Sequence, residues 1–277
     1  MDGRGDGHRG DAGPEQWSQA FPQLARAGLS DKLRILLEQA EAAHRESASL
    51  LRALGREDRA QRAEQFAAWT RLELDEPGLV QRLHAVTKSL RDASGLGLLL
   101  DRALNGALSL VRADRGNVQL LDPATGSLRI VAQQGFDADF LDYFAVVATD
   151  DGSACGRAAA QRTQTVITDV SIDPRFAPHR EIAAVSGFRA VQSTPLTDYA
   201  DRVLGVVSIH YPQPYRPPDR DLLVMRRFGQ RVGAIMADHL SAFPDGLAGD
   251  PLGWSVASRF GSRPVLQEPN PWQSTHR

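Results

Sequence analysis

The sequence predicts an α/β (α+β) protein with an antiparallel central sheet of about 5–6 strands, helices packed on that sheet, and helical N- and C-terminal extensions. Residues 116–121 and 127–133 are strand-like and are joined by the turn sequence DPATG, which suits a hairpin. Residues 190–196 and 203–211 form a second such pair. Before and after these strands, apolar residues recur every three or four positions, which is the spacing of amphipathic helices.

The composition is that of a globular protein. Of the 277 residues, 42% are hydrophobic and 24% are charged, which is enough for one domain to bury its own core. The formal net charge of −2 gives no long-range attraction to nucleic acid or to an anionic membrane, so we predict neither as a partner. No signal peptide and no stretch of roughly 18 apolar residues is present, so we expect a cytoplasmic protein.

Four segments are predicted along the chain. Residues 1–14 contain five glycines and no large apolar side chain, so they are expected to be disordered. Residues 15–76 form a helical extension that ends before Pro77-Gly78, and residues 77–241 form the domain. Residues 242–277 are rich in proline and lack periodicity, so we expect a mostly disordered tail.

An apolar stripe follows one face of the predicted N-terminal helix, for which Ser30 is the expected N-cap. Its members step by three and four positions: Leu33, Leu36, Ala40, Ala43, Ser47, Leu50 and Leu54. This stripe is small in the middle and rich in leucine at its ends. It could pack against a second copy of itself or lie on the adjacent domain.

The last helix is predicted after Pro217 and Pro218. Its stripe from Leu222 to Leu240 is wider than one sheet contact needs, because Phe228 and Ile235 extend it. The extra width indicates a partner helix. We therefore predict a homodimer held through the terminal helices, with Met225 and Val232 in its interface.

Five short sequence segments lie between residues 152 and 211: GSACG (152–156), VITDV (166–170), DPRFAPHR (173–180), RAVQSTPL (189–196) and LGVVSIHY (204–211). In their order and spacing they resemble the GAF domain, in particular its bacterial sensory and signalling type. The resemblance covers roughly residues 80–240 and implies a non-catalytic regulatory module. Such a module binds a small molecule in a pocket and signals through dimer or partner contacts. The resemblance names no ligand, and the cofactor stays unknown.

Three special activities of GAF-like domains find no match in this sequence. Members that reduce free methionine sulfoxide rely on more than one cysteine, whereas Cys155 is the only one here. Bilin-binding members attach the bilin through a cysteine in a loop whose counterpart here, FAPHR, has none, so a covalent bilin is not expected. The Asn-Lys and Asp-Glu pattern of cyclic-nucleotide-binding members is also absent. We therefore predict no enzymatic activity.

Cys155 has two interpretations. A thiol at a helix N-terminus has its thiolate favoured, which would suit a redox switch or an enzyme working with a partner thiol. Alternatively, the cysteine is a small buried residue that packs the helix on the sheet and is unreactive, and this is what we predict. A single cysteine excludes an intramolecular disulfide and a zinc site of several cysteines, and no metal site is expected.

The predicted ligand site lies between the loop of residues 169–180 and the hairpin of residues 190–211. The loop is rich in donors and could hold a carboxylate or phosphate, although its charged residues could equally cap a turn or face water. Polar side chains on an internal hairpin need partners, so a small polar or anionic ligand is expected. The candidate ligand-binding residues are Cys155, Asp169, Phe176, His179, Arg180, Gln192, Thr194, Ser208 and His210.

Two further functional hypotheses stay open beside the ligand-binding sensor. One is the thiol-dependent switch or enzyme centred on Cys155. The other is a ligand-free dimerisation scaffold whose pocket is filled by its own side chains. No kinase, cyclase or helix-turn-helix segment is recognisable, so we expect a separate output protein, such as a kinase or regulator, to carry the signal.

Overall fold

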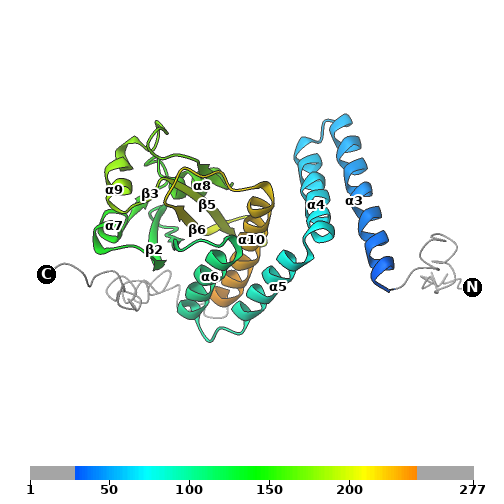
Figure 1. The fold of residues 1–277 in the computed structure, drawn as a ribbon, viewed down its shortest axis with the longest axis horizontal. Helices are drawn as coiled ribbons and strands as arrows, with labels where there is room; N and C mark the ends of the chain where they lie inside the picture. The colour runs from blue at the N-terminus through cyan, green and yellow to red at the C-terminus, as the bar shows by residue number, and fades with distance from the viewer. Residues whose placement is uncertain (1–28, 242–277) are drawn as a thin grey trace, which may run out of the picture. The chain divides into compact units, whose positions relative to one another are not determined.

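The computed structural model describes residues 29–241 (Figure 1). They form two compact units that divide between Pro77 and Gly78, and each is described by itself. The disorder predicted for residues 1–14 and 242–277 lies outside the described residues, as does the start of the helical extension predicted from residue 15.

The first unit is an antiparallel pair of helices, α3 (Leu29–Ala53) and α4 (Glu57–Asp75). Gly55 has a φ of 66°, the left-handed conformation that the tight turn between the helices requires. Buried alanines lie along these helices: Ala48, Ala60, Ala63 and Ala67. Their small side chains allow the two helix backbones to approach closely.

The predicted apolar stripe of α3 does not pack on α4. Its leucines, Leu33, Leu36, Leu50 and Leu54, are 42% to 74% exposed. Here the seven residues predicted for this stripe are called the α3 stripe. Ser30 is the second residue of α3 and therefore lies inside the helix, so its prediction as N-cap is wrong.

In the described part of the second unit, six strands form an antiparallel sheet in the order β3-β2-β1-β6-β5-β4. The predicted fold class is thus confirmed. The strands are β1 (Arg115–Leu121), β2 (Ser127–Gln134), β3 (Val147–Ala148), β4 (Thr165–Ile167), β5 (Ala190–Thr197) and β6 (Val203–Tyr211). Both predicted hairpins are present, and the pairing of β1 with β6 joins them into one sheet.

Helices cover both faces of this sheet (Figure 1). On one face lie α6 (Leu96–Val111) and α10 (Asp219–Ser241), with α5 (Pro77–Arg91) beside them. On the other face lies α8 (Ala154–Gln161), accompanied by α7 (Ala138–Tyr143) and α9 (Arg180–Val185). The segment predicted as a plain loop after residue 168 is therefore partly helical, since a 3-10 turn (Ala177–His179) precedes α9.

The wide apolar stripe of α10 is buried inside its own unit. Met225, Phe228 and Val232 are 0% exposed, because the sheet covers one side of the helix and α6 covers another. Phe228 lies against Gly106 of α6. The partner helix that the width indicated is thus α6 of the same chain, and the prediction that Met225 and Val232 hold a dimer together is wrong.

Two glycines let α10 lie directly on the backbone of β5. An added Cβ would be 2.3 Å from the carbonyl oxygen of Pro195 at Gly229, and 2.2 Å from that of Thr197 at Gly233. We predict that Gly233→Ala lowers the free energy of unfolding by about 1–3 kcal/mol, because α10 must move off the sheet. This loss should outweigh the better helix propensity of alanine, about 1 kcal/mol.

Urea-induced unfolding followed by circular dichroism measures this difference. Gly78→Ala is the matched control, because nothing lies within 4 Å of its added Cβ in α5. That variant should be as stable as the parent or up to about 1 kcal/mol more stable. The same change in stability for both variants would contradict the close contact between α10 and β5.

Candidate functional site

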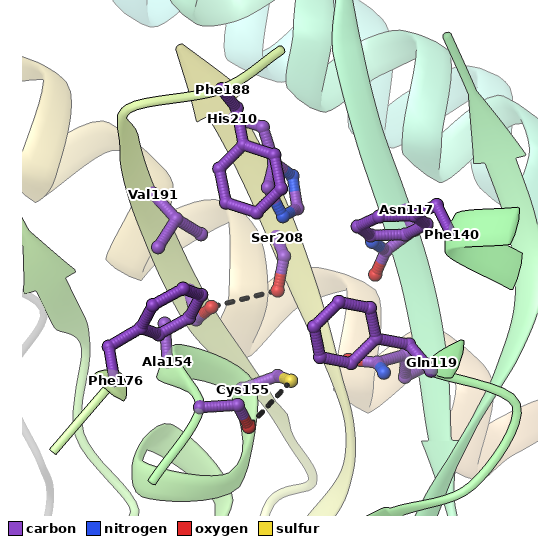
Figure 2. Close-up of a pocket in the computed structure, with 13 residues that line it drawn as sticks. Asn117, Gln119, Phe140, Ala154, Cys155, Phe176, Phe188, Val191, Ser208 and His210 are labelled. Atoms are coloured by element: carbon purple, nitrogen blue, oxygen red, sulfur yellow. Dashed lines mark hydrogen bonds between the residues drawn. The ribbon is translucent and has the colours of Figure 1, made fainter. Parts of the chain in front are cut away.

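A small cavity lies between the sheet and the helices on its α8 face (Figure 2). Its volume is about 20 Å³, which is room for about one water molecule. The lining residues are Asn117, Gln119, Phe140, Phe144, Ser153, Ala154, Cys155, Phe176, Phe188, Val191, Ser193, Ser208 and His210. The protein's own side chains, four phenylalanines among them, therefore fill most of the space that was predicted to hold a ligand.

The turn before α8 brings the backbone close to the loop that carries Phe176. Gly152 has a φ of 88°, and an added Cβ there would be 2.1 Å from the carbonyl oxygen of Arg175. Ser153 caps the helix, because its Oγ accepts a hydrogen bond from the N–H of Gly156. The segment GSACG thus starts α8 at a fixed place and sets Cys155 on the cavity wall.

Cys155 is buried, as predicted. Its Sγ lies 3.3 Å from the Oγ of Ser153. Burial raises the pKa of the thiol to about 11, because a thiolate would lose its hydration, and this outweighs the hydrogen bond from Ser153. The side chain is therefore a neutral thiol at physiological pH, and its low reactivity stays a prediction.

His210 is surrounded by aromatic rings. The rings of Phe136 and Phe188 meet it edge-on, with centroids 4.8 and 4.7 Å from the centroid of the imidazole. Burial, and to a smaller extent the charge of Arg115, lowers the pKa of His210 to about 3. The imidazole is therefore uncharged at neutral pH.

Three buried polar atoms at the cavity have no hydrogen-bond partner among the described residues. They are Asn117 Oδ1, Gln119 Oε1 and His210 Nδ1. Asn117 and Gln119 are two positions apart on β1 and therefore point to the same face of the sheet. Because each such atom costs about 1–3 kcal/mol when it stays unpaired, this wall is where a water molecule or a ligand is needed.

Four of the predicted candidates line this cavity: Cys155, Phe176, Ser208 and His210. Ser208 and Ser193 face each other across the hairpin and share a hydrogen bond of 2.8 Å (Figure 2).

Gln192 and Thr194 lie on the opposite face of the sheet. The register of the hairpin pairs Gln192 with Ile209, one residue beyond the Ser193–Ser208 pair, and side chains alternate between the two faces. Thr194 consequently lies close to Gly229 of α10. Gln192 and Thr194 were predicted to belong to one ligand site with Ser208 and His210, but the two pairs lie on opposite faces of the sheet.

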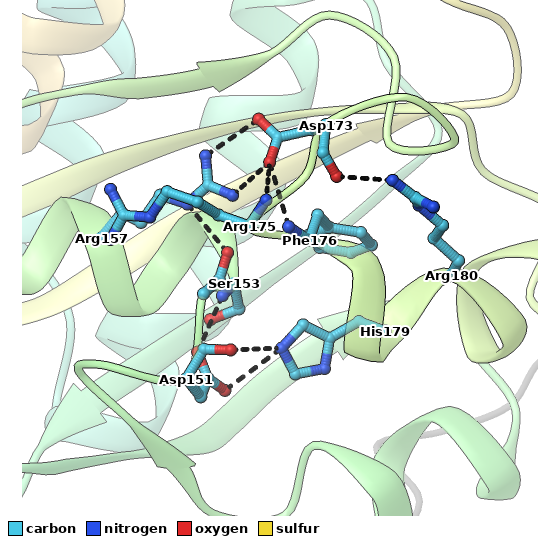
Figure 3. A network of polar contacts seen from close by, with 9 residues as sticks. Asp151, Ser153, Arg157, Asp173, Arg175, Phe176, His179 and Arg180 are labelled. Carbon is cyan, nitrogen blue, oxygen red and sulfur yellow. Dashed lines mark hydrogen bonds and ion pairs between the residues drawn. The ribbon is translucent and has the colours of Figure 1, made fainter.

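The loop before α9 is held by an ion pair rather than open to the cavity (Figure 3). Arg157 of α8 donates two hydrogen bonds, of 2.6 and 3.0 Å, to the carboxylate of Asp173, and these lower the pKa of Asp173. The same carboxylate accepts hydrogen bonds from the N–H groups of Arg175 and Phe176. Arg180 donates to the carbonyl oxygen of Asp173. This network fixes the place at which Phe176 enters the cavity wall.

Asp169 and His179 are also engaged within the loop and its neighbours. Arg189 donates hydrogen bonds to Asp169, with a shortest distance of 2.9 Å, and lowers its pKa to about 2. His179 Nε2 lies 2.9 Å from the carbonyl oxygen of Asp151, and its Nδ1 lies 3.1 Å from the hydroxyl of Tyr143. Asp169, His179 and Arg180 therefore each bond to a different partner, and none of them lines the cavity.

Most residues of the cavity wall were not among the candidates predicted from the sequence. The missed residues are Asn117, Gln119, Phe140, Phe144, Ser153, Ala154, Phe188, Val191 and Ser193. A signal existed, because Asn117 and Gln119 alternate with Val118 and Leu120 along β1. Such alternation is typical of a strand with one buried and one solvated face, but the layer of α7 and α8 covers the polar face and buries both amides.

Residues 29–241 contain no group of three or more His, Cys, Asp or Glu side chains that could hold a metal ion. Over the same residues, no helix has the length and apolar character needed to cross a membrane.

The buried imidazole predicts a specific pH dependence of stability. The folded state does not protonate His210 until about pH 3, whereas the unfolded chain binds this proton near pH 6.5. Because the unfolded state binds more protons, stability falls as the pH decreases from about 6.5 toward 3, by up to about 1.4 kcal/mol per pH unit.

Urea unfolding of the parent and of His210→Gln between pH 8.5 and 4.5 measures the effect. The parent should lose more stability than the variant on acidification, whereas the difference between them should be constant above pH 7.5. Parallel stability curves over the whole range would show that His210 is not held neutral.

The comparisons with known proteins agree with this fold. The GAF domain model matches residues 95–236, which is half of the chain. No curated protein matches the chain. A GAF domain of a phosphoenolpyruvate-protein phosphotransferase from Coxiella burnetii is 16% identical with a TM-score of 0.53, covering 60% of this chain and 96% of that one. For the corresponding domain from Acinetobacter the values are 16%, 0.51, 60% and 97%.

A third similar structure is an enzyme. It is the free methionine-R-sulfoxide reductase from Neisseria meningitidis in complex with its substrate, 17% identical with a TM-score of 0.50, covering 59% of this chain and 91% of that one. Domains of this fold are typically sensory modules that bind small molecules, although some are enzymes. Because the family model spans half of the sequence, and solved GAF domains share the fold of this unit, the chain belongs to the GAF domain family.

Proposed function

We propose that residues 78–241 form a sensory module that binds a small molecule in the cavity on the α8 face of the sheet. The observation that carries this proposal is the set of three buried polar atoms without partners, on Asn117, Gln119 and His210. A scaffold that never bound a ligand would gain stability by replacing these polar groups with apolar ones. Their presence on one wall supports binding.

Binding requires the cavity to open, because its present volume holds about one water molecule. Phe176 lies on the loop that Asp173 and Arg157 hold against α8. An entering molecule displaces at least one ring of the wall, and displacement of Phe176 would move this loop. The loop is at the surface, so its movement is a route by which a separate output protein, a kinase or regulator, would sense occupancy.

We predict that a screen of anionic, cationic and uncharged metabolites finds a compound that stabilises the protein. A ligand at a hundredfold excess over Kd should add about 2.7 kcal/mol to the free energy of unfolding. Thermal shift detects this gain, and calorimetry gives the stoichiometry. Ala154→Leu, which adds bulk to the cavity wall, should abolish the gain.

Arg180→Ala is the matched control, because Arg180 lies in the loop but does not line the cavity. It should keep the stabilisation. If no compound stabilises the parent protein, the ligand-free scaffold is the better description. A gain that survives Ala154→Leu would place the ligand elsewhere.

We infer that the module has no catalytic activity of its own. The reductase that shares the fold acts on a substrate, but the thiol of Cys155 is buried and protonated, and the sequence has no second cysteine to form a disulfide with it. These observations weigh against the thiol-dependent switch or enzyme. The cytoplasmic location expected from the sequence stays a prediction.

We further propose that the chain forms a homodimer through the α3 stripe. The seven positions step by alternating three and four residues from Leu33 to Leu54, which is the a/d spacing of a coiled coil. The leucines at both ends are exposed, while another face of α3 packs on α4. Alanine and serine at the middle positions would let two α3 helices approach closely. A second copy of α3 matches this pattern of large and small residues.

Leu36→Glu combined with Leu50→Glu should convert the dimer to a monomer without lowering the melting temperature of the second unit, because both leucines are exposed. Sedimentation velocity at micromolar concentration measures the change. Ala42→Glu combined with Ser49→Glu adds the same charge at exposed positions of α3 outside the stripe and should leave the dimer intact. A parent protein that sediments as a monomer would disprove the dimer.

A further inference from the structure

The cavity has no charged residue on its wall. The two lining residues that can ionise, Cys155 and His210, are both uncharged at neutral pH because burial disfavours their charged forms. An ion that entered this space would lose its hydration without meeting a counter-charge, which is strongly unfavourable.

Two arginines at the loop, Arg157 and Arg189, already have carboxylate partners. Asp173 forms an ion pair with Arg157, and Asp169 forms one with Arg189. Recruiting either arginine for an anionic ligand would leave a carboxylate without its partner. Neither ion pair is therefore a ready partner for the anionic form of the small polar or anionic ligand that was predicted from the sequence.

The hydrogen-bonding capacity of the wall is specific in kind. Asn117 and Gln119, 2% and 1% exposed, present two carbonyl-type acceptors to the same space (Figure 2). Both oxygens, Asn117 Oδ1 and Gln119 Oε1, are buried and have no hydrogen-bond partner among the described residues. Two adjacent acceptors match a molecule with several N–H groups.

Aromatic rings set the shape of the remaining wall. Phe140, Phe144, Phe176 and Phe188 line the cavity, and Phe136 stacks on Phe140 with centroids 3.7 Å apart. Ring faces and edges pack well against a flat apolar group. A planar molecule can take the place of one of these rings with little loss of packing.

We propose that the ligand of this cavity is an uncharged, planar molecule that donates N–H hydrogen bonds to Asn117 and Gln119, as a primary aromatic carboxamide does. This proposal rests on the proposed ligand-binding function and names the class of molecule. Its polar end faces β1, and its ring lies among the phenylalanines.

The test uses a library in which each planar ring is supplied as its primary carboxamide, its carboxylate and its N,N-dimethylamide, with benzamide, benzoate and N,N-dimethylbenzamide as the first set. Calorimetry and thermal shift measure binding to the 277-residue chain. Compounds that bind should be primary carboxamides, and their carboxylate and dimethylated forms should bind at least about tenfold more weakly. Asn117→Leu and Gln119→Met should each weaken carboxamide binding at least about tenfold, without lowering the melting temperature of the ligand-free protein.

Gln192→Met is the matched control. Gln192 is also fully buried and also has an unpaired amide atom, but it lies on the opposite face of the sheet. This variant should bind carboxamides within about twofold of the parent. Carboxylates that bind more tightly than carboxamides, or carboxamides that bind Gln119→Met as well as the parent, would overturn the ligand class and leave the sensory function standing. Absence of any binding compound, here and in the broader screen, would overturn both.

Discussion

Helices cover both faces of the sheet, and this constraint governs the chemistry of the whole domain. The side chains of β1, β5 and β6 are almost all buried, whichever face they point to. Polar residues on the α8 face are therefore withdrawn from water together with their apolar neighbours. Each needs a hydrogen-bond partner, which is either another protein group, as for Ser193 and Ser208, or a bound molecule.

The same burial explains why ionisable groups in the interior are neutral while the charges lie around it. Cys155 and His210 are both shifted toward their uncharged forms, in opposite pKa directions, by one cause, the loss of hydration. Arginines and carboxylates pair at the rim, where Arg157 and Asp173 hold the loop against α8. The ion pair at the edge of the cavity thus positions the loop that carries Phe176. The uncharged residues inside the cavity determine which molecules it can accommodate.

The two long apolar stripes of the chain differ in burial although their sequence patterns are similar. The stripe of α10 lies against the sheet and α6, and Gly229 and Gly233 remove the side chains that would keep this helix off the β5 backbone. Among the described residues of its own unit, nothing covers the α3 stripe in this way, because α4 packs against another face of α3. Exposure, rather than hydrophobicity, therefore separates a surface that can hold a partner from one that builds the core.

The sequence by itself determined the elements whose patterns are local. Alternating strand residues and the DPATG turn predicted the β1–β2 hairpin, and the spacing of apolar residues predicted α5, α6 and α10. The five segments from GSACG to LGVVSIHY, in their order and spacing, indicated the GAF domain family. Two of the candidates chosen from the sequence, Cys155 and His210, line the cavity.

Only the tertiary structure decided which face of each strand meets the cavity and which layer covers it. A shift of one residue in the β5–β6 register exchanges Gln192 and Thr194 for Ser193, because side chains alternate with a period of two. The pattern of Asn117 and Gln119 along β1 is typical of a solvated face. They are buried because α7 and α8, which are distant in sequence, cover this face. Burial and strand register depend on contacts between segments that are far apart in the chain. For that reason a local sequence pattern cannot predict them.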